Sequence, residues 1–138
     1  MKLLTYVFLN GKCEEALDFY TKAVGAKALC VSRFSDAPAN PGMTVPSGWK
    51  DKIMHSLLQV GETQLMLSDC DLSAKAHQGF QLTLCVESRD EGERLFNALA
   101  DGGAIEMPFG PTFWALGFGT LVDRFGIRWS ISAGEQPA

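Results

Sequence analysis

The sequence predicts an α+β fold made of two tandem βαβββ modules that together form a cup-shaped, curved sheet. Three observations predict it. The order strand, helix and three strands can be followed twice along the 138 residues. The two copies align with each other, Glu15 with Glu91 and Phe19 with Leu95 at one constant offset. Each helix has one apolar face, which can pack on one face of its sheet. The other face of the sheet stays open, and a second module can cover it.

The first module begins with a strand and an amphipathic helix. Residues 3–9 (LLTYVFL) are apolar, β-branched and aromatic, which is typical of a strand. We expect Asn10 to cap the helix that follows, with Glu14 near its positive end and Gly25 just beyond its last turn. Its apolar residues recur at helical spacing: Ala16, Leu17, Tyr20, Ala23 and Val24.

Three more strands and a long loop complete this module. The strands are expected at 27–34, 52–60 and 63–68, the last two joined by a turn at Gly61. The loop at 34–50 contains three prolines and two glycines. A loop of this length is usually functional or mobile, and both interpretations stay open. As a lid, it would bring Trp49 over a bound ligand.

The second module repeats this order. After a strand at 80–87, Ser88 and Glu91 form a capping box that starts a helix, and Gly102 ends it. Leu95, Phe96 and Leu99 give this helix its apolar face. The remaining strands are expected at 104–107, 115–122 and 127–132.

A tight turn joins the last two strands. Asp123 starts it, and Gly126 is free to adopt a positive φ. Alternation along the last strand puts Arg128, Ser130 and Ser132 on the face expected to line the cup. The other face then carries Ile127, Trp129 and Ile131.

Composition limits the class of protein. The length suits one domain over residues 1–138, with modules at about 1–70 and 78–134. A net charge of −4 with interspersed signs argues against nucleic acid, and no apolar run suits a membrane helix. Asn10 and Lys12 stand where a signal peptide would need small residues, so we expect a cytoplasmic protein. Cys30 and Cys85 lie in apolar strand patterns and are expected to be buried thiols.

Several motifs carry a resemblance to a known family. The segments EEALDFYTKAVGA, QLMLSD, FNALADGGAIEMP and TFWALGFGTLVDRFGIRWSI resemble the PhnB-like branch of the vicinal oxygen chelate superfamily, which includes glyoxalase I, bleomycin-resistance proteins and extradiol dioxygenases. The resemblance implies this family's fold and a homodimer, sometimes with exchanged modules, but no particular reaction. The branch is often labelled "3-demethylubiquinone-9 3-methyltransferase-like", yet the chain has no glycine-rich nucleotide loop.

The resemblance also implies where a divalent metal would bind. Family enzymes take four ligands from the first and last strands of the two modules. The repeat alignment places Thr5, Met66, Gln81 and Ser130 at these positions. None of them is the His, Glu, Asp or Cys that such metals prefer. We therefore expect neither a metal nor another cofactor.

Four further residues are candidates for a site. His55, in a strand, is either an acid–base group in the cup or a hydrogen-bonded strand histidine. Arg128 either binds an anionic ligand or lies at the rim. Trp114 is either a pocket wall or part of a core or interface. His77, with Asp69, Cys70 and Asp71, is either a zinc site or a solvated loop.

The function that these residues favour is metal-free binding of a small molecule in a cavity between the modules. Its candidate binding residues are Thr5, His55, Met66, Gln81, Trp114, Arg128 and Ser130. The alternatives are a divalent-metal-dependent glyoxalase-type lyase or dioxygenase, a metal-free enzyme that uses His55 as base, and a purely structural dimer. The sequence identifies no catalytic residue and no ligand.

Overall fold

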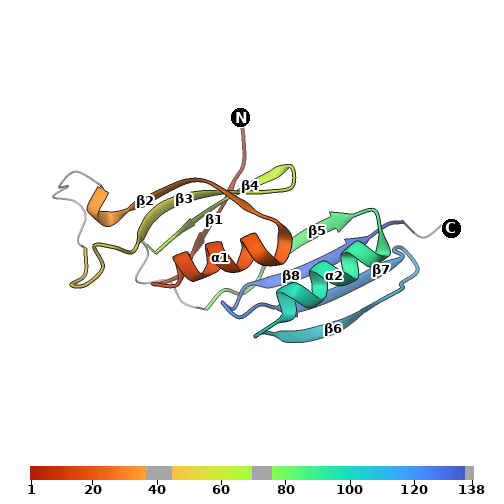
Figure 1. The fold of residues 1–138 in the computed structure, drawn as a ribbon. Helices are drawn as coiled ribbons and strands as arrows, with labels where there is room; N and C mark the ends of the chain where they lie inside the picture. Colours follow the sequence, from red (N-terminus) through yellow and green to blue (C-terminus); the bar gives the residue numbers. More distant parts are fainter. Residues whose placement is uncertain (37–44, 70–75, 136–138) are drawn as a thin grey trace. The chain divides into compact units, whose positions relative to one another are not determined.

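The computed structural model describes residues 1–36, 45–69 and 76–135 (Figure 1). The chain divides into two compact units, Met1–Ala74 and Lys75–Ala138. Each unit contains one α-helix and one four-stranded sheet. The α+β class and the repeated order of one strand, one helix and three strands are therefore confirmed.

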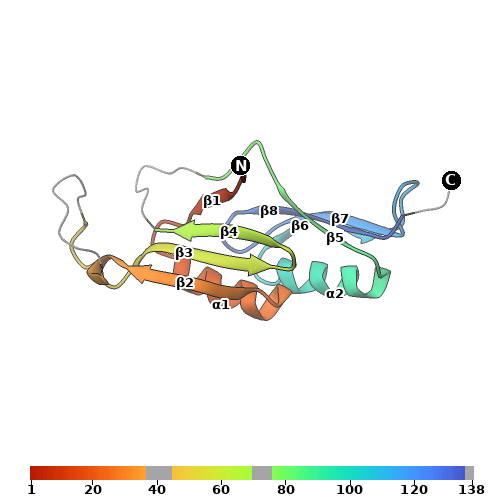
Figure 2. The same cartoon turned by 90° about the horizontal axis from the view of Figure 1, so that it is seen from above.

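The first unit is a mixed sheet with the strand order β1-β4-β3-β2. Its elements are β1 (Thr5–Phe8), α1 (Cys13–Val24), β2 (Lys27–Arg33), the 3-10 turn η1 (Phe34–Asp36), β3 (Ile53–Val60) and β4 (Thr63–Ser68). β1 runs parallel to β4, while β3 is antiparallel to both β4 and β2. The predicted hairpin between β3 and β4 turns at Gly61, whose φ is 56°. Figures 1 and 2 show α1 along one face of this sheet.

The strand register separates the two faces of this sheet. Ser56 pairs with Leu67, and Leu67 pairs with Val7. All three are buried, and Cys13 of α1 contacts Ser56, so α1 covers this face. We call the opposite face of each sheet its helix-free face. Of the apolar residues predicted to face the core from α1, all are buried except Val24, which is half-buried.

The start of α1 differs from the prediction that Asn10 caps it. The N-cap residue is Lys12, whose side chain makes no capping bond. Instead the carboxylate of Asp69, just after β4, accepts hydrogen bonds from the backbone N–H groups of Gly11 (2.7 Å) and Cys13 (3.0 Å). Its other oxygen accepts from Ile53 N–H at 3.1 Å. A carboxylate distant in sequence therefore supplies the acceptor that Asn10 was expected to provide.

The second unit repeats this topology with the strand order β5-β8-β7-β6. Its elements are β5 (Leu82–Val86), α2 (Arg89–Ala100), β6 (Ala104–Gly110), β7 (Gly117–Val122) and β8 (Arg128–Ala133). β5 is parallel to β8, and β7 is antiparallel to both β8 and β6. The pairing pattern is thus the same in both units.

The second helix begins and packs as the sequence predicts. The Ser88 hydroxyl accepts a hydrogen bond from the backbone N–H of Glu91 at 3.2 Å. Leu95, Phe96 and Leu99 are buried, and Gly102 follows the helix with a φ of 78°. Neither helix of the described segments is long and apolar enough to cross a membrane.

The turn between β7 and β8 is organised by Asp123, which is buried. One carboxylate oxygen accepts from the backbone N–H groups of Phe125 (2.9 Å) and Ile127 (3.0 Å). The other accepts from the indole Nε1–H of Trp129 at 2.9 Å. Gly126 has a φ of 83°, and the predicted apolar face of the last strand is buried. Ser130 is buried as well, although it lies on the helix-free face.

The prediction for the cysteines is wrong. Cys30 and Cys85 are exposed, whereas Cys13 is buried. Cys30 pairs with Leu57 and Cys85 with Ser132, which places both thiols on helix-free faces. An apolar run does not reveal which face of a strand a helix covers. Burial, reinforced by the negative charge of Asp69, raises the pKa of the Cys13 thiol to about 12.

Candidate functional site

The helix-free face of the first sheet carries a group made by Tyr6, Phe8 and His55. Tyr6 Oη and His55 Nδ1 are hydrogen-bonded at 2.9 Å, and the two rings meet edge to face with centroids 5.6 Å apart. The Phe8 ring stacks on Tyr6 at 4.9 Å. Because β4 lies between β1 and β3, the hydrogen bond bridges over one strand. His55 is therefore oriented by a phenol that the sequence reasoning missed.

Thr5 does not belong to this group. The register pairs Tyr6 with Met66, whereas Thr5 pairs with Leu65, which is buried on the α1 side. A shift of one residue changes the face of a strand, so the repeat alignment was one residue out of register here. Tyr6 takes the place expected for Thr5, beside a half-buried Met66.

The helix-free face of the second sheet brings Gln81 and Ser130 together, as the repeat alignment predicts. Gln81 Nε2 donates to Ser130 Oγ at 3.4 Å. Thr83 Oγ1 lies 2.7 Å from the same Ser130 oxygen and was missed. Thr83 follows Gln81 by two positions, so strand alternation could have identified it. We call Gln81, Thr83 and Ser130 the hydroxyl cluster.

Arg128 lies on the same face as the hydroxyl cluster but is already paired. Its Nε atom is 2.8 Å from Oε1 of Glu106, and Nη2 donates to Oε2 at 3.2 Å. Both side chains are partly exposed, at 47% and 40%. From the sequence, the expected partner of Arg128 is an anionic ligand or solvent; in the structure its partner is a carboxylate from β6. The β6 bulge between Ile105 and Met107 falls at Glu106.

Trp114 belongs to an aromatic cluster at one end of the second sheet. Its ring meets Phe118 at 5.3 Å and Phe113 at 4.8 Å, both edge to face. Phe118 pairs with Ser132, so this cluster adjoins the helix-free face of β8. Trp114 is 44% exposed and Phe113 is 89% exposed. Neither ring is part of the core of its unit.

Two further groups of candidate residues, Trp49 with its loop and the residues around His77, lie only partly within the residues that the structure describes. Trp49 is half-buried, and its ring lies 3.4 Å from where a side chain on Gly11 would begin. Residues 37–44 of the long loop lie outside the described residues, so its action as a lid stays a prediction. Cys70 and Asp71 also lie outside them. Both oxygens of Asp69 accept hydrogen bonds from backbone N–H groups, and His77 lies beside the Phe80 ring. Zinc site and solvated loop both stay open as interpretations of this segment.

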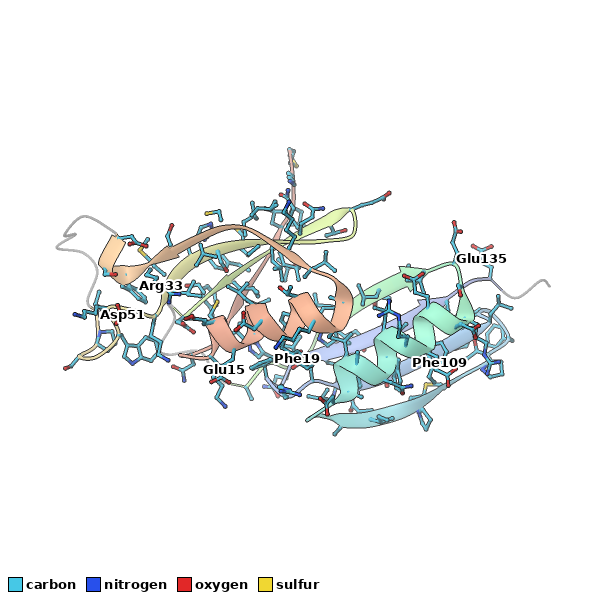
Figure 3. All side chains as sticks on the ribbon, viewed as in Figure 1. Glu15, Phe19, Arg33, Asp51, Phe109 and Glu135 are labelled. Atoms are coloured by element: carbon cyan, nitrogen blue, oxygen red, sulfur yellow. The ribbon has the colours of Figure 1, made fainter. Side chains whose placement is uncertain are left out.

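A surface hollow of about 410 Å³ lies at the start of α1, lined by Glu14, Arg33, Gly48, Asp51 and Lys52. Arg33 forms a two-point pair with Glu14, at 2.9 and 3.0 Å, and also donates to the backbone oxygen of Asp51. Figure 3 shows Arg33 and Asp51 near each other in the first unit. The hydrogen bond from Arg33 holds the pKa of Glu14 below its ordinary value. Lys52 donates to the Gly11 carbonyl oxygen at 2.8 Å. Three of the lining side chains, those of Glu14, Arg33 and Lys52, are therefore engaged within the chain.

The residues present do not fit the metal that the resemblance implies. By the strand register, the paired side chains are a phenol and a thioether in the first unit and two hydroxyls in the second, with the Gln81 amide beside them. Divalent metals bind imidazole, carboxylate and thiolate far better. Within 1–36, 45–69 and 76–135, no three His, Cys, Asp or Glu side chains gather into a possible metal site.

Comparisons with known proteins cover nearly the whole chain. Residues 2–131 match the family model described as Glyoxalase/Bleomycin resistance protein/Dioxygenase superfamily. Protein YjdN of Escherichia coli (strain K12) is 35% identical over 143 residues, which is 99% of this chain and 97% of YjdN.

Two solved structures show the same likeness. Protein PA1353 from Pseudomonas aeruginosa is 42% identical and superposes with a TM-score of 0.85, covering 99% of each chain. The PhnB protein from Bacillus cereus is 25% identical with a TM-score of 0.76, covering 97% of this chain and 100% of that one. Both likenesses include the two units.

Proposed function

Since this chain belongs to the glyoxalase/bleomycin resistance protein/dioxygenase superfamily and has PhnB-like relatives, we propose that it binds a small organic molecule without a metal ion. The fold itself hosts many functions, so the proposal depends on the side chains. They are the hydroxyl cluster, the Arg128–Glu106 pair and the aromatic cluster around Trp114 on the second sheet. On the first sheet they are Tyr6, His55 and Met66.

The hydroxyl cluster is the observation that supports this proposal most. Gln81 and Ser130 stand where the resemblance implies metal ligands, but they hydrogen-bond to each other, and Ser130 also bonds the Thr83 hydroxyl. Hydroxyl and amide groups both donate and accept hydrogen bonds, so they can match the polar groups of an organic ligand. Aromatic side chains beside such groups are typical of small-molecule sites.

We also propose that the protein is a homodimer in the cytoplasm and that it has no nucleic-acid partner. The family resemblance supports the dimer. The net charge of −4 supports the absence of a nucleic-acid partner, because phosphate binding needs a basic surface. Size-exclusion chromatography with light scattering measures the subunit number.

Metal analysis and native mass spectrometry of the purified protein test the main proposal. We expect less than stoichiometric divalent metal, and a retained or added small molecule bound to the folded chain. Added Zn²⁺, Ni²⁺ or Mn²⁺ should leave the midpoint of thermal unfolding unchanged, because only a ligand that binds the native state raises it. One equivalent of tightly held metal per chain would overturn the proposal.

A second candidate, metal-free proton transfer at His55, is favoured by its hydrogen bond to Tyr6. A histidine oriented by a neighbour can remove a proton next to a carbonyl group. The probe is deuterium incorporation at the α-carbons of dihydroxyacetone in D₂O. We expect exchange by the wild type, its loss in His55→Gln and a reduced rate in Tyr6→Phe. Equal exchange by all three proteins would exclude this role.

A further inference from the structure

We propose that the helix-free face of the second sheet recognises one class of molecule, a carboxylate joined to an aromatic ring by a spacer. The inference deepens the proposed function and rests on it. It concerns one unit alone, because every contact that supports it lies within residues 75–138. Three features lie one after another beside β8, from its end toward its start: the aromatic cluster, the hydroxyl cluster and the Arg128–Glu106 pair.

The aromatic end is held in place by its loop. The Thr112 hydroxyl accepts hydrogen bonds from the backbone N–H groups of Trp114 (3.4 Å) and Ala115 (3.1 Å), and Thr112 N–H donates to the Ala115 carbonyl oxygen at 3.1 Å. Phe118 supports the indole from the strand. The loop therefore presents an ordered, 44% exposed indole ring on which a planar apolar group can stack.

The charged end can exchange its partner. The pair with Glu106 uses Nε and Nη2 of Arg128, which leaves the Nη1 amino group for another acceptor. Since both side chains are partly exposed, the pair contributes little to stability and is easily opened. The planar guanidinium group binds a carboxylate through two parallel hydrogen bonds, so a ligand carboxylate can replace that of Glu106.

The strand fixes the length of the ligand. Phe118, which supports Trp114, pairs with Ser132, and Arg128 lies four residues before Ser132 on β8. A strand rises about 3.3 Å per residue, so the two ends are about 13 Å apart along the backbone. Ser130 lies midway, where the hydroxyl cluster can bond a polar group of the spacer. A molecule that bears a ring and a carboxylate at this separation engages both ends together.

The probes are phenylalkanoates of increasing length, from phenylacetate to 8-phenyloctanoate, measured by isothermal titration calorimetry with the full chain. We expect affinity to peak at an intermediate length, near 6-phenylhexanoate, which spans most of this separation when it is extended. The neutral amide of 6-phenylhexanoate should bind about tenfold more weakly than the carboxylate, because the charge-assisted hydrogen bond to Arg128 is lost. An affinity that grows steadily with chain length would show mere hydrophobic adsorption and overturn the inference.

Variants at the charged end change affinity in opposite directions. Arg128→Gln should weaken 6-phenylhexanoate binding about tenfold, whereas Glu106→Gln should strengthen it several-fold by removing the competing carboxylate. Asp101→Asn is the matched control, since it removes another exposed carboxylate paired with an arginine, Arg124 at 3.0 Å. It should leave the affinity unchanged. Weaker binding by Glu106→Gln would contradict the exchange of partners.

Two exposed thiols locate the bound probe. Cys85 pairs with Ser132 on this face, near the aromatic end, while Cys30 lies on the first sheet. Saturating 6-phenylhexanoate should slow iodoacetamide labelling of Cys85, measured by peptide mass spectrometry, and leave Cys30 unchanged. Trp114→Leu should weaken binding about fivefold, the value of one aromatic contact. Unchanged Cys85 labelling at saturation would refute this location.

The outcomes separate this inference from the proposed function. If native mass spectrometry detects a different small molecule while no phenylalkanoate binds, metal-free binding stands and the ligand class is wrong. If the protein binds no small molecule and holds one metal ion per chain, both are wrong.

Discussion

Replacement of Asp123 by alanine tests how the turn before β8 is held. Asp123 is only 3% exposed, and its carboxylate accepts hydrogen bonds from the backbone N–H groups of Phe125 and Ile127 and from the Trp129 indole. The bonds to Ile127 and Trp129 are buried. The substitution leaves both buried donors without this acceptor, in a place with little access to water.

The expected cost follows from these two bonds. A hydrogen bond to a charged group contributes about 1.5–3 kcal/mol, so Asp123→Ala should lower the free energy of unfolding by about 3–6 kcal/mol. That is a large part of the roughly 5–15 kcal/mol of a typical domain. Asp123→Asn keeps one acceptor oxygen for Phe125 and Ile127 but turns an NH₂ group toward the indole, so it should cost about half as much.

Urea unfolding followed by far-ultraviolet circular dichroism measures these differences. Hydrogen exchange by NMR adds a local measurement, since the Ile127 amide should lose protection in the alanine variant. The matched control is Asp101→Asn, a largely exposed carboxylate, which should change stability by less than about 0.5 kcal/mol. The reasoning is refuted if Asp123→Ala costs less than about 1 kcal/mol or no more than Asp123→Asn.

Three further measurements test the cores. At pH 8, iodoacetamide should label Cys30 and Cys85 but spare Cys13 until urea unfolds the chain; early labelling of Cys13 would show that it is not buried. The folded-state pKa of Cys13, about 12, exceeds the ordinary 9.0. The protonated thiol therefore contributes fully to the free energy of unfolding below pH 9, and this contribution is lost as the pH rises toward 12. From pH 8 to 10.5 the wild type should therefore lose about 1–2 kcal/mol more stability than Cys13→Ala, and equal losses would contradict the shift. A side chain on Gly119 would begin 2.7 Å from the Phe96 ring, so Gly119→Ala should cost about 1–3 kcal/mol by thermal unfolding. Gly110→Ala, which meets nothing within 4 Å, should cost almost nothing, and similar costs for both would contradict the packing argument.

Local patterns predicted the elements of this fold well. The Ser88 cap, the buried face of α2 and the turn ending at Gly126 depend on residues within a few positions of each other. The periodicity of apolar residues therefore contains enough information to place them. The repeated order of the elements then predicts the paired topology of the two units.

The residues predicted least well depend on partners from distant strands. Asp69 caps α1 across more than fifty residues, a contact that no local signal near Asn10 reveals. β1 has four residues, too few for alternation to decide whether Thr5 or Tyr6 shares a face with Met66. The pairs Tyr6–His55 and Arg128–Glu106 likewise form only once the sheets exist. A single sequence therefore does not reveal which residues of different strands lie next to each other.

The proposal that the hydroxyl groups of the helix-free face bind an organic ligand rather than a metal ion rests on their chemistry. Ser130 is 1% exposed, and a buried hydroxyl group is costly unless it is hydrogen-bonded. Thr83 and Gln81 satisfy it from β5 and its preceding residue. Each of these groups can exchange the roles of donor and acceptor by a rotation, so the cluster can accept a ligand's polar group without leaving a partner unsatisfied. A metal ion would need negative or imidazole ligands that no rotation of these side chains supplies.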